Sequence, residues 1–195
     1  MRTRRIAVWA GVGLAAMLMA GCRVESDKHG NGDNVTISTP FGGMHVKTND
    51  AVTPESIGVA AYPGASMVKK DNDNGSADVD MSFGGFQLRV KAADYRTGDA
   101  PDKVEAFYRT EMKRYGDVIA CRDHSSVGTP THTLEGLGCD EKHSSGYSNH
   151  AGSGELQLKA GSEQHQHIVS IESDGGGTKF GLVALDLPGK NGHED

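Results

Sequence analysis

The sequence has little positive charge, few aromatic side chains and only three cysteines. Its 20 Lys and Arg against 26 Asp and Glu give a formal net charge of −6, and 6% of its 195 residues are aromatic. An acidic chain lacks the clustered Lys and Arg that bind phosphates, which argues against nucleic acid as a partner. After residue 21, no apolar run is long enough to cross a membrane. The 27 glycines instead indicate a turn-rich protein with a modest core.

Recognisable catalytic and cofactor motifs are also missing. The segment Gly146–His150 approaches the G-x-S-x-G motif of serine hydrolases around Ser148, but its fifth residue is histidine. The segment Asp71–Gly75 resembles a calcium loop, but the acidic ligands required at the first and twelfth positions are not there. The segment Gly175–Lys179 lacks the spacing of a phosphate loop. We therefore predict no catalytic residue, no cofactor and no enzymatic activity.

The chain begins with a basic stretch followed by its one long uncharged run. Three arginines within the first five residues precede the run from Ile6 to Gly21, and Cys22 follows. This is the layout of a secretory signal, and the run is short for a membrane span. The segment Leu18–Cys22 resembles the lipobox of bacterial lipoproteins, in which the cysteine thiol is acylated (the palmitate type of anchor) and the chain is cut just before it.

The lipobox resemblance implies a signal peptide and a location, and length and composition predict the organisation of the rest of the chain. Residues 1–21 are expected to be a signal peptide, 22–33 a flexible tether, 34–188 a single domain and 189–195 a polar tail. Loss of the signal removes three arginines and no acids, so the formal charge moves from −6 to −9. Anionic headgroups do not attract such a chain, so membrane lipid bound through acylated Cys22 must hold it. By resemblance to lipoprotein sorting, Arg23 favours the outer membrane, with the inner membrane as the alternative, and the domain faces the periplasm or the surface.

The two remaining cysteines, Cys121 and Cys139, are expected to form a disulfide. An exported chain folds in an oxidising compartment, where paired cysteines are normally bridged. The loop that the bridge closes has a length for which the chain-entropy model gives roughly 3 kcal/mol. A redox-active pair is the alternative, but there is no C-x-x-C spacing to support it.

Periodic apolar residues predict an α+β fold. Alternation predicts two β-hairpins, over residues 34–48 and 77–92, and a three-stranded meander over 155–160, 166–172 and 178–187. Shorter strands are expected at 66–70 and 117–121, and residues 131–139 are a candidate extended segment. An amphipathic helix is predicted over 99–115, with Asp99 as its cap. Its apolar stripe consists of Val104, Phe107, Tyr108, Met112 and Tyr115. Strands around a single long helix favour an antiparallel sheet packed against that helix.

A second resemblance joins two of these segments. The Tyr62–Ala65 sequence (YPGA), followed by Ala100–Tyr108, is similar to a module of uncharacterised bacterial exported proteins. In that module a YPGA turn precedes a strand pair and a helix that contains a Phe-Tyr pair. The similarity spans residues 57–122 and implies no activity.

The histidines offer the alternative function. His165 and His167 stand at i and i+2 of an expected strand, so both rings would share a face and reach one metal ion. Further ligands would have to come from the loops, which contain His124, His132, His143 and His150. Because no third ligand has a fixed short spacing, we assign no metal site. We expect a lipid-anchored cell-envelope protein that acts as a non-enzymatic binding or structural module, with an envelope protein or polymer as partner. The alternative is a periplasmic zinc- or copper-binding protein.

Overall fold

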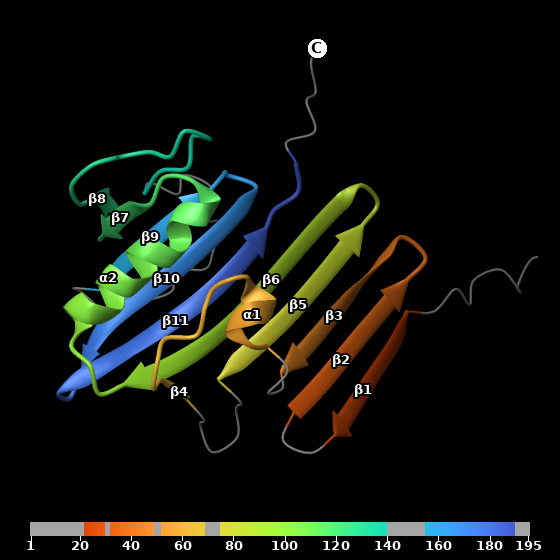
Figure 1. Ribbon diagram of the computed structural model, residues 1–195. Helices are drawn as coiled ribbons and strands as arrows, with labels where there is room; N and C mark the ends of the chain where they lie inside the picture. The colour runs from red at the N-terminus through yellow and green to blue at the C-terminus, as the bar shows by residue number, and fades with distance from the viewer. Residues whose placement is uncertain (1–21, 30–31, 49–51, 69–74, 140–154, 190–195) are drawn as a thin grey trace, which may run out of the picture.

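The computed structural model describes residues 22–29, 32–48, 52–68, 75–139 and 155–189. They form one large, mostly antiparallel β-sheet with few helices (Figure 1). The strands are β1 (Arg23–His29), β2 (Gly32–Thr39), β3 (Gly42–Thr48), β4 (Ser66–Met67), β5 (Ser76–Phe83), β6 (Phe86–Thr97), β7 (Ile119–Arg122), β8 (Ser125–Ser126), β9 (Leu156–Gly161), β10 (His165–Asp174) and β11 (Gly177–Asp186). Their order across the sheet is β1-β2-β3-β5-β6-β11-β10-β9-β7-β8, and β4 also pairs with β6.

Two helices lie on one side of this sheet. Helix α2 (Pro101–Glu111) continues as a 3-10 turn, η1 (Met112–Tyr115), and lies across β9, β10 and β11, whereas the single turn α1 (Pro54–Ile57) lies over β6 and β11 (Figure 1). Thr53 starts α1 with a capping box formed with Ser56. Pro101 stands in the first turn of α2, where its missing N–H costs little. In the part of the chain that the structure describes, no helix is long and apolar enough to span a membrane.

The core lies between the helices and the strands beneath them. Phe180 of β11 is 1% exposed, and its ring centroid lies 5.5 Å from that of Tyr108, 5.7 Å from Tyr95 and 6.0 Å from Tyr62. Tyr108 itself is completely buried. Aromatic rings at these separations bury large areas in favourable offset or edge contacts, so this cluster fastens α2 and the segment after α1 to the sheet.

The two predicted hairpins and the meander are confirmed, because alternating side chains and glycine turns are local signals. They correspond to β2–β3, β5–β6 and β9–β10–β11, with consecutive strands antiparallel. The strand expected at 117–121 is found as β7, and that at 66–70 is only the two residues of β4 within the described residues. The extended segment considered at 131–139 is not a strand; it has only one isolated bridge, between Gly136 and Ser162.

Other predictions near the chain start and the helix were wrong. Residues 23–29, expected in a flexible tether, form β1, because the pairing of Arg23–His29 with β2 uses backbone groups and needs no apolar side chains. Asp99 does not cap α2: the N-cap is Ala100, with no side-chain cap bond. Its carboxylate binds other side chains instead, as described below. The sequence also gave no indication of α1, whose four residues are too few for a periodic pattern.

Candidate functional site

Cys22, the expected lipid-attachment residue, lies at a corner of the sheet. It is exposed and immediately precedes β1, the first strand in the sheet order. Arg23 pairs with Ser38, so the chain enters the sheet at the level of the turn between β2 and β3 (Figure 1). Cys22 is therefore bonded directly to the first residue of the folded sheet.

The disulfide between Cys121 and Cys139 is confirmed. The two Cα atoms are 5.5 Å apart, and the bridge joins β7 to the loop that returns from β8. Both cysteines are buried and pack with Ile119 and Leu137 in a small second cluster. The bridge therefore holds the loop over residues 123–138 against the far edge of the sheet.

The two strand histidines share a face of β10, as expected, but they contact different groups. The Nδ1 atom of His165 lies 2.9 Å from Oδ1 of Asp186 at the surface. The ring of His167 stacks on Tyr115 with centroids 3.6 Å apart, and its Nδ1 atom is buried without a hydrogen-bond partner. Burial lowers the pKa of His167, which favours the neutral ring.

No metal-binding cluster forms among the residues that the structure describes. No group of three or more His, Cys, Asp or Glu side chains there could hold a metal ion. His132 contacts the hydroxyl of Thr131, and His124 stands in the β7–β8 turn with a φ of 61°. His143, His150, Ser148 and the Asp71–Asn74 loop lie outside the described residues. Gly175 and Gly176 form the β10–β11 turn, in agreement with its interpretation as a hairpin turn.

A shallow groove lies beside His165. It encloses about 330 Å³ and is lined by Gly85, Gln87, Arg89, Gln164, His165, Asp186, Leu187, Pro188 and Gly189. Arg89 donates a 2.9 Å hydrogen bond to Asp80, and His165 contacts Asp186, so its charged groups are already paired. The groove combines donors and acceptors from three elements, a combination that sequence spacing does not reveal.

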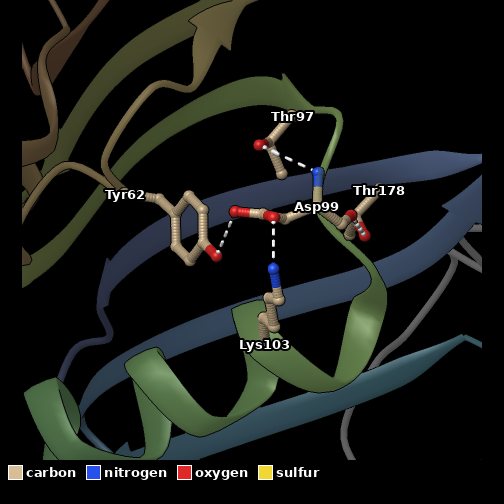
Figure 2. Close-up of polar contacts among 5 residues, drawn as sticks. All are labelled: Tyr62, Thr97, Asp99, Lys103 and Thr178. Carbon is tan, nitrogen blue, oxygen red and sulfur yellow. Dashed lines mark hydrogen bonds and ion pairs between the residues drawn. The ribbon is translucent and has the colours of Figure 1, made fainter.

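Figure 2 shows a second polar cluster, centred on Asp99 at the start of α2. The hydroxyl of Tyr62 and the ammonium of Lys103 each donate to the Asp99 carboxylate over 2.9 Å. Thr178 donates to the Asp99 carbonyl over 2.7 Å. Hydrogen bonds lower the pKa of Asp99, the larger effect coming from Lys103 and the smaller from Tyr62. The cluster thus contains a stable carboxylate, and no nucleophile stands beside a free base.

The Asp99 cluster joins the two segments that carry the YPGA similarity. The ring of Tyr62 meets that of Phe107 edge-on at 5.1 Å and lies 6.4 Å from that of Tyr108. The YPGA tyrosine therefore contacts the Phe-Tyr pair of the helix with its ring, and Asp99, which precedes the N-cap of the helix, with its hydroxyl. These contacts give the cluster a structural role: they hold the loop after α1 onto the sheet.

The largest feature that sequence reasoning missed is an apolar face on the side of the sheet away from the helices. Strand register places Val46, Val79, Val90 and Leu185 in one row, and a second row, nearer the β2–β3 and β5–β6 turns, contains Val24, Ile37, Met44, Met81 and Leu88. These side chains alternate with core residues such as Ala93 and Leu182, so they point away from α1 and α2. We call the two rows the open face. Each side chain in them is at least partly exposed.

Comparison with protein-family models, with curated proteins and with solved structures gives no match to this chain.

Proposed function

We propose that this chain is a lipid-anchored protein of the bacterial cell envelope, attached through acylated Cys22. The supporting observation is the lipobox-like Leu18–Cys22 segment together with the exposed position of Cys22 beside the first strand. A thiol at the surface is accessible to an acylating enzyme, and a lipid on it would not disturb the core. Because one acyl chain binds a membrane only marginally, stable anchoring requires at least two.

We further propose that the folded domain is a non-enzymatic binding or structural module. The charged groups of the groove already form salt bridges or hydrogen bonds with neighbouring side chains, and so do those of the Asp99 cluster. Helix α2 would serve as its main amphipathic helix, with Val104 and Tyr108 buried and Asp102 and Lys103 exposed. Such a framework presents surfaces to an envelope protein or polymer.

Membrane fractionation and mass spectrometry of the N-terminal peptide test the anchor. The natural chain is expected in the membrane fraction, with a peptide that starts at Cys22 and carries acyl chains. The Cys22→Ser variant is expected to lack this peptide. A natural chain with an intact N-terminus and a free thiol would refute the proposal, and separation of inner from outer membranes would decide between the two locations.

A further inference from the structure

We propose that the tip of the open face is a lipid-contacting surface, which rests on the same leaflet that holds the acyl chains of Cys22. We define the tip by four exposed apolar residues. Phe41 is 83% exposed, Val24 63%, Phe86 42% and Phe83 41%. The inference builds on the proposed anchoring through Cys22 and adds a contact made by the folded domain itself.

The four tip residues lie together at one end of the sheet. Val24 belongs to the start of β1, Phe41 to the β2–β3 turn, and Phe83 and Phe86 flank the β5–β6 turn (Figure 1). The two turns are joined directly, since the Gly84 amide donates to the Phe41 carbonyl over 3.0 Å. All four therefore lie along the end of the sheet at which Cys22 enters, from β1 at its edge to β6 further in.

The tip is continuous with the apolar open face. Phe83 pairs with Phe86, and each stands two residues along its strand from a member of the open face, Met81 and Leu88 respectively. Side chains two apart in a strand point to the same side. An uncharged surface thus extends from the aromatic tip through the two rows of the open face.

The opposite side of the same strands is polar. Its side chains include Thr36, His45, Asp80 and Arg89, which pair across the strands through the Thr36–His45 contact at 2.8 Å and the Arg89–Asp80 ion pair at 2.9 Å. A sheet with one charged and one apolar side is suited to a boundary between water and an apolar phase. Exposed apolar patches of this kind mark contact sites rather than ordinary surface.

A lipid leaflet is the occupant that the position of Cys22 favours. The described residues begin at Cys22, and only Arg23 lies between Cys22 and Val24. Acyl chains on Cys22 would hold Val24 close to the membrane, since two residues span at most about 7 Å. The three phenylalanines lie along the same end of the sheet and would face the same leaflet. At that distance exposed phenylalanines enter the boundary between headgroups and acyl chains, as they do on interfacial helices.

Tryptophan scanning with brominated lipids tests this contact. Trp9, the single natural tryptophan, is replaced by Phe, and one tryptophan is then introduced as F41W or F86W. The full chain is processed in cells, purified from membranes and reconstituted in phosphatidylethanolamine–phosphatidylglycerol vesicles, with or without brominated acyl chains. We expect both tryptophans to lose most of their emission to brominated lipid and to emit at shorter wavelength than in the detergent-purified protein.

Two matched controls separate the tip from its neighbours. Gln87 is exposed, follows Phe86 in β6 and points to the opposite side, and exposed Ser173 lies at the other end of the sheet, next to the β10–β11 turn. Q87W and S173W are expected to keep their emission in brominated vesicles. If brominated lipid changed the emission of all four variants equally, the proposal would be overturned. It would also be overturned if a second copy of the chain shielded F86W, which would be detected as a cross-linked dimer without quenching.

The anchor is read independently in the same samples. A lipid-bearing Cys22 peptide with unquenched tip variants would refute only the lipid-contacting tip and leave the proposed anchor standing. A Cys22 peptide without lipid would refute the anchor, and with it the position of the leaflet on which this proposal rests.

Discussion

Replacing both Cys121 and Cys139 with alanine removes the cross-link while leaving no hydroxyl group in the small cluster around it. The bridge spans 18 residues, for which the chain-entropy model gives about 3 kcal/mol through restriction of the unfolded chain. Both cysteines are at most 4% exposed and pack with Ile119 and Leu137, so loss of the sulfur contacts acts in the same direction. We therefore expect the free energy of unfolding to fall by about 3 kcal/mol.

Urea unfolding measures this loss. With a slope of about 2 kcal/mol per molar urea, the midpoint of the double variant should fall by roughly 1.5 M. In a thermal scan the same loss corresponds to about 6–12 °C. Both proteins are compared in the same detergent. Reduction of the natural protein should reproduce the shift and should leave the variant unchanged. A double variant that unfolds at the natural midpoint would refute the loop-closure argument.

Four further predictions follow from the core, the two titrating groups and the histidines. Phe180→Ala should destabilise the fold by about 3–5 kcal/mol in urea, because it empties the centre of the aromatic cluster, whereas Phe41→Ala should change stability by no more than about 0.5 kcal/mol. Because burial lowers the pKa of His167, the fold should lose stability as the pH falls below 6.5; His167→Phe, which keeps a ring on Tyr115, should remove this loss in thermal scans, and His165→Phe should not. The pKa of Asp99 is lowered in the folded state, so its carboxylate stabilises the fold at pH values above its ordinary pKa of 3.8. This contribution disappears as the pH falls through the lower pKa of the folded state. Asp99→Asn should therefore weaken the loss of stability at acid pH. A calorimetric titration with zinc should show no heat of specific binding. Micromolar binding that His165→Ala abolishes would instead favour the metal-binding alternative.

The parts of the fold that sequence reasoning predicted depend on local patterns. The glycine turns of two hairpins, the alternation of the meander strands and the spacing of Cys121 and Cys139 are each visible within a short segment. The wrong or missing predictions have two causes. β1 pairs with β2, its neighbour in sequence, without the apolar alternation that would have predicted a strand, whereas Asp99 is bound by Tyr62, which is 37 residues away.

The candidate sites divide in the same way. Cys22 can be proposed from five consecutive residues, whereas the open face becomes visible only when the register across β1, β2, β3, β5 and β6 is known. Alternation in a single strand shows that one side is apolar. It does not show whether that side meets a helix, and here the alternation in β5 was compatible with either result.

The two halves of the sheet are stabilised differently. Among the described residues, no buried apolar side chain comes from β1, β2, β3 or β5, and the core is formed by β6, β7, β9, β10 and β11 together with the two helices and the segments next to them. The strands nearest Cys22 therefore depend on backbone pairing and on half-exposed contacts, which are the weaker sources of stability in a sheet. A surface that covers the open face would supply the apolar burial that this half lacks. Attachment at Cys22 would then both locate the protein and stabilise the strands that the helices leave uncovered.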